Sequence, residues 1–260
     1  MSADEMRRIL DHLLEDHDEL DIINFTGGEP TMHAGLLDFM AMCREAGIRR
    51  LTVSTNGLKL MDESYLRKLA QLDVRVILSF DTFSPETDRK LLGANTVDRK
   101  LKLLDLLAEH DVTTTLLPAI AAGYNDSEVG DILNLVLSRP NICSLELHTM
   151  TFTGQGGTGF SRSGRITIPD LHQQIAESTS GKIVGADFVP SPLAHPHCYS
   201  ICYLLLLDDG DYIPFTRIMS QQQMYELLQD SLYIEPRDQL EQVFRETIDR
   251  LWANPDLVPE

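Results

Sequence analysis

The chain has 260 residues, enough for one large α/β domain or for a core domain with a small appendage. Its formal net charge is −18, from 40 acidic and 22 basic residues, so we expect no nucleic-acid partner. No apolar run reaches the roughly 18 residues that span a bilayer. The N-terminus also lacks an apolar signal segment, so the sequence predicts a cytoplasmic protein without a transmembrane segment.

Short apolar runs alternate with amphipathic segments over the first 150 residues. The first helix is predicted over residues 4–16. Strands are predicted at residues 20–25, 51–54, 74–80, 112–119 and 143–148, and further helices at 36–46, 62–72, 97–110 and 126–138. This alternation indicates right-handed βαβ units and a parallel sheet or barrel, in which ligands bind at the carboxyl ends of the strands.

The composition changes after residue 150. A glycine-rich stretch precedes a predicted helix at residues 168–178, and a segment rich in proline, histidine and cysteine covers residues 190–202. The apolar run that follows ends in an acidic turn and predicts a β-hairpin. A terminal helix is predicted at residues 237–252. We therefore expect a core domain over residues 1–150 and a C-terminal extension over residues 151–260.

A glycine-rich turn follows the first predicted strand. Gly27 and Gly28 let the backbone approach a ligand closely, and they leave peptide groups free to bind it. Glu29 can accept hydrogen bonds from an ammonium group, and Pro30 stiffens the exit of the turn. The same residue types are also common in ordinary strand–helix turns, so a ligand-binding loop and a plain turn are equally compatible with this segment.

Polar side chains also follow the next two predicted strands. Ser54 and Asn56 come at the end of one strand, and Ser79 and Asp81 at the end of the next. Their hydroxyl, amide and carboxylate groups suit the hydroxyls of a sugar, although the same groups also cap helices and close turns.

The three segments Gly27–Pro30, Ser54–Gly57 and Ser79–Asp81, in this order and each after a strand, resemble the strand-end motifs of the radical S-adenosylmethionine (radical SAM) superfamily. The resemblance implies a partial (βα)6 TIM-like barrel of parallel strands. It also implies SAM and a [4Fe–4S] cluster as cofactors, and an electron donor such as ferredoxin or flavodoxin. The residues that it assigns to SAM are Gly27, Gly28, Glu29, Pro30, Ser54, Asn56, Ser79 and Asp81.

The sequence departs from the superfamily in one respect. Its members carry a CxxxCxxC loop after the first barrel strand, and no such spacing occurs in these 260 residues. The predicted elements begin with what would be the first helix, and a barrel without its first strand has an unpaired edge. We therefore expect a barrel that lacks its first strand, in a truncated or split gene product, and reductive cleavage of SAM by this chain is in doubt.

The four cysteines fall into two groups. Cys43 and Cys143 lie in a predicted helix and strand, where buried structural thiols are expected. Cys198 and Cys202, with His195 or His197, predict an iron or zinc site, and the alternative is two partly buried thiols in a loop. This segment resembles a superfamily branch that includes archaeal tetraether-lipid synthase and pterin-modifying enzymes. That resemblance implies an auxiliary iron or iron–sulfur site, and a lipid or other small-molecule substrate such as a pterin.

Three functions remain open at this point. The first is a radical SAM enzyme, or a fragment of one, that would activate a C–H bond through a 5′-deoxyadenosyl radical. The second is a SAM-binding or regulatory subunit without a cluster. The third is a divalent-metal-dependent barrel lyase that uses Glu29, Asp81 and His148. His148, at the end of a predicted strand, is also a candidate for lining a substrate cavity.

Overall fold

A computed structural model describes residues 1–17, 20–152, 160–161, 165–195, 198–207, 210–228 and 238–253. The chain forms two compact units, Met1–Arg165 and Ile166–Glu260. This division lies after the predicted boundary near residue 150. The stretch between the two positions includes residues 153–159 and 162–164, which lie outside the described residues.

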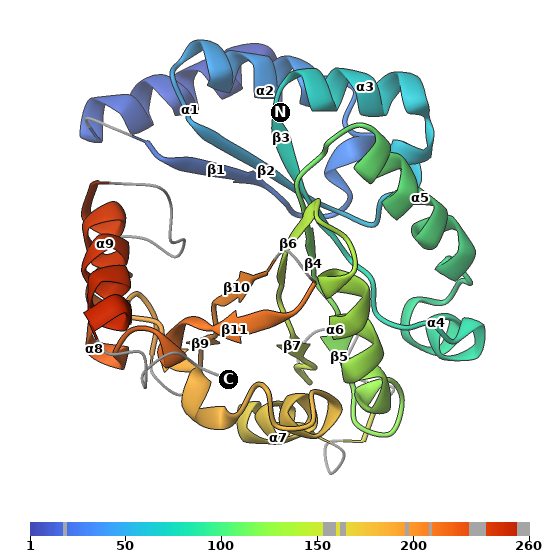
Figure 1. Ribbon diagram of the computed structural model, residues 1–260. Helices are drawn as coiled ribbons and strands as arrows, with labels where there is room; N and C mark the ends of the chain where they lie inside the picture. Colours follow the sequence, from blue (N-terminus) through green and yellow to red (C-terminus); the bar gives the residue numbers. More distant parts are fainter. Residues whose placement is uncertain are drawn as a thin grey trace. The chain divides into compact units, whose positions relative to one another are not determined.

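The first unit is built on a five-stranded sheet in the order β1-β2-β3-β4-β6 (Figure 1). Every neighbouring pair in this sheet is parallel. The strands are β1 (Ile22–Phe25), β2 (Arg50–Thr55), β3 (Val74–Leu78), β4 (Thr114–Leu116) and β6 (Ile142–Leu145). A separate parallel pair joins β5 (Ala119–Ile120) to β7 (His148–Thr149). The predicted α/β class with parallel strands is confirmed.

Helices of the first unit lie along the outer face of the curved sheet (Figure 1). The α-helices are α1 (Ala3–Asp16), α2 (Leu36–Glu45), α3 (Glu63–Gln71), α4 (Pro85–Leu92), α5 (Val97–Glu109) and α6 (Val129–Leu137). Short 3₁₀ turns accompany them in the described residues: η1 (Pro30–Met32), η2 (Leu58–Met61) and η3 (Asp126–Glu128). Helix α4 was not predicted, because its segment was assigned to a loop. It begins in the ordinary way, with Ser84 accepting from the Thr87 amide at 3.2 Å and proline in the first turn.

Two predicted strands are each broken into two. The run over residues 112–119 gives β4 and β5, because Pro118 has no N–H group to donate to a sheet ladder. The run over residues 143–148 is also divided, with β6 in the main sheet and β7 paired to β5. Residues 119–120 and 148–149, which follow the two breaks, therefore pair with each other in a separate small sheet.

The core of the first unit lies between the sheet and its helices. Leu51 and Val53 on β2 have no exposed surface. Among the α1 residues whose burial is described, Met6 and Leu10 are buried, whereas Ile9 is 46% exposed, so the buried face of this helix is narrow. On α5 the buried stripe follows the helical period and includes one charged residue, Lys100. Its members are Val97, Lys100, Leu103, Leu104 and Leu107.

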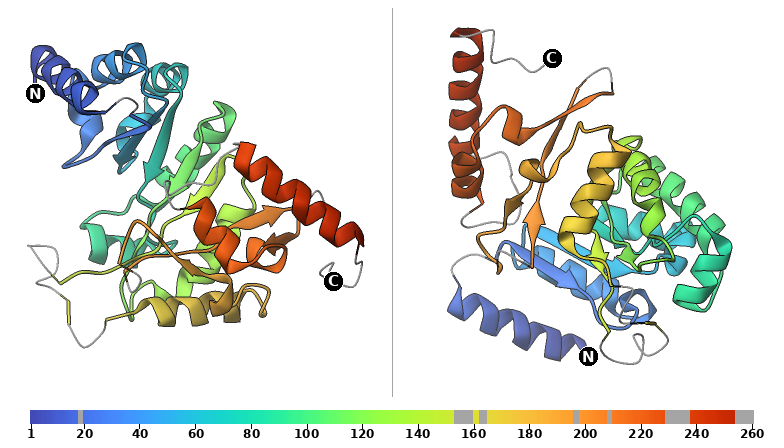
Figure 2. Two further views of the ribbon diagram at one scale, coloured as in Figure 1. Left: turned by 90° about the vertical axis from the view of Figure 1, so that its left-hand side faces the viewer. Right: turned by 90° about the horizontal axis from the view of Figure 1, so that it is seen from below.

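In its described residues, the second unit combines α-helices with small antiparallel sheets (Figure 2). Its elements are α7 (Ile168–Ser178), η6 (Gly185–Asp187), β8 (Val189–Pro190), β9 (Ser200–Ile201), β10 (Leu204–Leu206), β11 (Tyr212–Pro214), η7 (Phe215–Arg217), α8 (Gln221–Leu227) and α9 (Asp238–Ala253). The predicted hairpin is confirmed as the β10–β11 pair. Within the described residues, no helix of either unit is long and apolar enough to cross a membrane.

His172 connects α7 to the small sheet of the second unit. Its ring stacks on Phe188 with centroids 4.0 Å apart, and its Nε2 atom lies 3.0 Å from the Ser200 hydroxyl on β9. Burial lowers the pKa of His172. A neutral imidazole is therefore part of the folded arrangement.

Acidification is expected to destabilise this region. Because the folded pKa of His172 lies below its unfolded value of 6.5, protons bind more readily to the unfolded state. The stability contribution is complete above pH 6.5 and is lost as the pH falls through the folded pKa. Amide hydrogen exchange of residues 168–178 in urea, measured between pH 7.5 and pH 5.5, should show this loss of stability in the wild type. An equally steep loss in His172→Gln would contradict the prediction.

Candidate functional site

The parallel strands β1, β2 and β3 end at one edge of the sheet, and the glycine turn follows β1 there. Gly27 has a φ of 128°, which L side chains rarely adopt. A Cβ atom added at Gly27 or at Gly28 would have no neighbour within 4 Å. Both glycines are exposed. The peptide groups of this turn therefore border open space at the end of the strand.

Glu29 joins the glycine turn to the end of β2. Its Oε1 atom accepts from the Thr31 amide at 3.1 Å, the Thr31 hydroxyl at 2.5 Å and the Thr55 hydroxyl at 2.7 Å. Its Oε2 atom accepts from the Asn56 amide at 2.8 Å. Burial raises the pKa of Glu29, but these hydrogen bonds outweigh it and the pKa lies below its ordinary value. The ionised carboxylate thus fixes the turn against the neighbouring strand, with Pro30 opening η1 directly after it.

Polar side chains of β1 and β2 pair across the sheet just before this edge. Asn24 on β1 accepts from the Thr52 hydroxyl at 2.8 Å and donates to the Ser54 hydroxyl at 3.3 Å. Asn56 is exposed, and its side-chain oxygen accepts from the Leu58 amide at 2.9 Å. Ser54 is therefore already held by protein groups, whereas the amide nitrogen of the Asn56 side chain makes no hydrogen bond to another described residue.

Ser79 and Asp81 follow β3 but lie in different surroundings. Ser79 is half-buried and its amide donates to the Thr55 carbonyl at 3.1 Å, which aligns it with the end of β2. Asp81 is only 5% exposed. Its Oδ1 atom accepts from the Ala119 amide at 2.8 Å, and its Oδ2 atom lies 3.9 Å from Lys100 Nζ. Asp81 therefore lies beneath the strand ends, among protein partners.

Several residues of this region were missed by the sequence analysis. Thr31 and Thr55 complete the cradle of Glu29. Thr55 begins the Thr-Asn-Gly string within the predicted segment Ser54–Gly57, of which only Ser54 and Asn56 were assigned to SAM. The burial of Lys100 could have been predicted from the sequence. Leucines follow it at i+3, i+4 and i+7, which places the lysine on the apolar face of the helix. His148 is exposed and faces Glu146 at 3.6 Å.

The cysteines of the first unit do not form a site. Cys43 is fully buried on α2, as predicted for a structural thiol, and burial raises its pKa to about 11. The prediction that Cys143 is buried is wrong. Cys143 is exposed on β6, the last strand of its sheet, and its thiol lies 3.6 Å from the Thr114 carbonyl.

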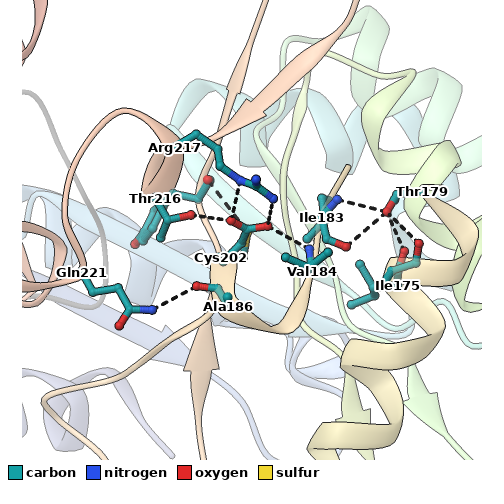
Figure 3. Close-up of polar contacts among 12 residues, drawn as sticks. Ile175, Thr179, Ile183, Val184, Ala186, Cys202, Thr216, Arg217 and Gln221 are labelled. Carbon is teal, nitrogen blue, oxygen red and sulfur yellow. Dashed lines mark hydrogen bonds and ion pairs between the residues drawn. The ribbon is translucent and has the colours of Figure 1, made fainter. Parts of the chain in front are cut away.

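In the second unit, Cys202 lies beside a buried carboxylate. The Asp187 side chain accepts from Arg217 Nε and Nη2, both at 2.9 Å, from the Thr216 hydroxyl at 2.7 Å and from the Val184 amide at 2.8 Å (Figure 3). Burial and then the charge of Asp187 raise the pKa of Cys202 to about 12, against the influence of Arg217. In the metal-free chain the Cys202 thiol is therefore protonated at neutral pH.

The other predicted metal ligands are close to Cys202 in the sequence. Cys198 and His195 are exposed, and His197 lies outside the described residues. Among the residues that the structure describes, no three His, Cys, Asp or Glu side chains come close enough to hold a metal ion. A metal site at Cys198 and Cys202 stays a prediction.

Comparisons with known proteins identify the fold and the family. A sequence model of the Radical SAM superfamily matches residues 1–136. The chain is 27% identical over 254 residues to a 7,8-dihydro-6-hydroxymethylpterin dimethyltransferase of Methanocaldococcus jannaschii, a match that covers 89% of this chain and 50% of that protein. It is 31% identical over 158 residues to a GTP 3′,8-cyclase of Heliobacterium modesticaldum, with 60% and 47% covered. The chain thus spans about half the length of the curated relatives it matches.

Solved structures show the same fold at low sequence identity. SuiB of Streptococcus suis, in its crystal structure bound to S-adenosylmethionine, matches with a TM-score of 0.52 and 20% identity over 61% of this chain and 36% of SuiB. The likeness shows a TIM-like barrel fold. The sequence model covers more than half of the chain, and its matched region contains all three strand-end motifs. This chain therefore belongs to the radical SAM superfamily, the enzymes of SAM-dependent radical chemistry.

Proposed function

We propose that this chain binds SAM at the edge where β1, β2 and β3 end, as the SAM-binding core of a radical SAM enzyme. The observation that carries the proposal is the open backbone of Gly27 and Gly28, held in place by the Glu29 bridge to β2. Exposed peptide groups beside open space suit a polar ligand that approaches the main chain closely. Bound SAM supplies the adenosyl group from which this superfamily generates a radical.

The candidate residues divide into two sets. Gly27 and Gly28 would receive the amino acid part of SAM, and Ser54, Asn56 and Ser79 would face its polar groups with hydroxyls and an amide. Glu29, Pro30 and Asp81 support the site from behind. Glu29 and Asp81 already accept hydrogen bonds from neighbouring protein groups, which favours positioning over direct contact with the ligand.

The cysteines of this chain do not fit a [4Fe–4S] cluster. Its first unit contains only Cys43, buried in the core, and Cys143, on an edge strand. A cluster of this kind is held by three closely spaced cysteine thiolates, and these two cysteines cannot provide them. The same observation favours a second candidate function, a SAM-binding subunit whose radical chemistry depends on thiolates from elsewhere.

The relatives guide a proposal for the substrate class. One relative, whose match covers 89% of this chain, is a dihydropterin dimethyltransferase, and another is a GTP cyclase. Both names describe small nitrogen heterocycles as substrates. We propose a substrate of this class, with a lipid as the alternative that the C-terminal segment suggested. The barrel lyase has less support, because Glu29 and Asp81 are engaged and His148 is exposed.

Binding of SAM to the iron-free chain tests the proposal directly. Gly28→Val places a branched side chain beside the turn. Its Cβ atom would have no protein atom within 4 Å, so the side chain should block the ligand without unfolding the chain. Calorimetry should show SAM affinity falling at least about tenfold, equivalent to about 1.4 kcal/mol. Gly185→Ala, in the second unit and with only ordinary contacts at 3.9 Å, is the matched control and should bind as the wild type.

Two results would overturn the proposal. One is a folded wild-type chain that does not bind SAM at all. The other is a Gly28→Val variant that binds SAM as tightly as the control. Binding by the iron-free wild type, with no SAM cleavage after anaerobic iron–sulfur reconstitution, would favour the subunit without a cluster over the complete enzyme.

A further inference from the structure

Lys100 on α5 has a buried charge that the proposed function does not use. Its side chain is 3% exposed and shares the buried stripe of the helix with three leucines. Its Nζ atom lies 3.9 Å from Oδ2 of Asp81, which is 5% exposed. Within the described part of the chain, neither of these two atoms has a hydrogen-bond partner. A buried ammonium in an apolar stripe is costly unless it compensates another charge.

A second carboxylate shares this buried region. Asp88 on α4 is 1% exposed, and its Oδ2 atom accepts from the Thr96 hydroxyl at 2.9 Å and from the Thr96 amide. Since Thr96 immediately precedes α5, Asp88 fixes the start of the helix that carries Lys100. The titratable groups that act on Lys100 are Asp81 and Asp88, and those that act on Asp81 are Lys100 and Asp88. Two carboxylates and one ammonium therefore share one low-dielectric region.

Burial acts on the two partners in opposite senses. It raises the pKa of Asp81 and lowers the pKa of Lys100, so that each would become neutral if it were alone. Each partner's charge opposes that tendency in the other. Without the ammonium, the ionised Asp81 would be an uncompensated charge beside the like charge of Asp88.

Asp81 connects this buried charge to the strand ends. Its Oδ1 atom accepts from the Ala119 amide at 2.8 Å, and its main-chain carbonyl accepts from Asn125 Nδ2 at 2.7 Å. Asn125 is fully buried and also bonds the Ala119 carbonyl at 2.9 Å and the Ala121 amide at 2.8 Å. The end of β3 and residues 119–121, which include β5, are thus held together through Asp81 and Asn125.

We propose that Lys100 is a positioning residue for the SAM site: its ammonium compensates the buried Asp81 carboxylate, which in turn holds residues 119–121 against the end of β3. Lys100 itself contacts no ligand. The inference rests on the proposed function, because residues 119–121 border the same strand ends as Ser79. It assigns a role to a helix residue that lies outside all three strand-end motifs.

The test compares three variants by SAM binding at two pH values. Lys100→Met should weaken SAM binding at least about tenfold at pH 8, because Asp81 becomes an uncompensated buried charge. At pH 6 the loss should be smaller, since the raised pKa of Asp81 allows a proton to replace the missing ammonium. The double variant Asp81→Asn with Lys100→Met keeps an oxygen acceptor for the Ala119 amide without any charge. It should recover affinity to within about threefold at both pH values.

The third variant is the matched control, and a second measurement needs no ligand. Lys102→Met removes an exposed lysine from the same helix and should bind SAM as the wild type. Hydrogen exchange of the Ala119 and Ala121 amides should accelerate at least about tenfold in Lys100→Met, and return toward the wild-type rate in the double variant.

The outcomes separate this inference from the proposed function. If the wild type binds no SAM, the proposed function fails, and the exchange rates still decide whether Lys100 orders residues 119–121. If the wild type binds SAM but Lys100→Met binds equally well at both pH values, the positioning role is wrong. Equal exchange rates of the Ala119 amide in Lys100→Met and in the wild type would overturn it as well.

Discussion

Replacing Gly57 with alanine is expected to lower the free energy of unfolding of the first unit by about 3 kcal/mol. Gly57 follows β2 with a φ of 80°, a conformation that costs an L residue about 1 kcal/mol. An added Cβ atom would lie 2.6 Å from Leu78 Cδ1 and closer still to Leu103 Cδ2. Both leucines are buried in the core, so neither can move aside without creating strain, which accounts for the remaining 2 kcal/mol or so.

Gly93→Ala separates these two contributions. Gly93 ends α4 with a φ of 76°, and an added Cβ atom there meets nothing within 4 Å. Its substitution should cost about 1 kcal/mol, the backbone contribution alone. Urea unfolding monitored by circular dichroism, with the slope of the transition compared among the three proteins, measures both losses. Equal losses in the two variants would show that the leucine contacts do not constrain Gly57.

Gly57 also shows why the Thr-Asn-Gly string had two compatible explanations. A glycine is required at this position for packing, because the turn passes so close to Leu78 and Leu103 that a Cβ atom would clash with them. Its threonine and asparagine instead serve Glu29, one through a hydroxyl and the other through a main-chain amide. A motif that resembles a ligand-binding sequence is therefore in large part the structure that supports the ligand-facing turn.

The fold was predictable where one rule governs a whole segment. The helix at residues 168–178 and the β10–β11 hairpin follow from periodicity and turn chemistry, and both are observed. Strand breaks were harder to predict, because a single proline at position 118 diverts β5 to a different partner. The apolar pattern of α1 does not distinguish the exposed Ile9 from the buried Met6 and Leu10, because burial depends on how the helix packs on the sheet.

The candidate site was predictable in its position and less so in its internal connections. Parallel strands deliver their carboxyl ends to one edge, so Gly27, Ser54 and Ser79 could be grouped from sequence order alone. The burial of Asp81 depends on Lys100 and Ala119, which are 19 and 38 residues further along the chain, and no local pattern encodes that contact. Tertiary contacts therefore decide which polar strand-end residues face outward and which lie beneath.

Glu29→Gln is expected to lower the free energy of unfolding of the first unit by about 2 kcal/mol at pH 7. The ionised carboxylate accepts on both oxygens, whereas the amide has one oxygen and one NH₂ group. In either orientation, at least one main-chain amide, that of Thr31 or that of Asn56, then loses its acceptor. SAM binding should weaken as well, because the glycine turn loses its link to β2.

The difference between wild type and Glu29→Gln should shrink on acidification. The folded pKa of Glu29 lies below its ordinary value of 4.5, so its contribution to stability is complete above pH 4.5. That contribution is lost as the pH falls through the folded pKa. Urea titrations at pH 7 and at pH 3.5 measure the two differences. A difference that is the same at both pH values would mean that the charge of Glu29 contributes nothing.

Glu63→Gln is the matched control for the loss of a carboxylate. Glu63 lies in the first turn of α3 and pairs with Arg67 at 2.5 Å on the surface, with 49% of its side chain exposed. Water and salt screen such a pair, so this substitution should change stability far less than Glu29→Gln and should leave SAM binding intact. Equal effects of the two substitutions would mean that the cradle of Thr31, Thr55 and Asn56 adds nothing to an ordinary surface charge. A larger loss of stability in Glu29→Gln, accompanied by a loss of SAM affinity, would show instead that one carboxylate stabilises both the strand ends and the turn that receives the ligand.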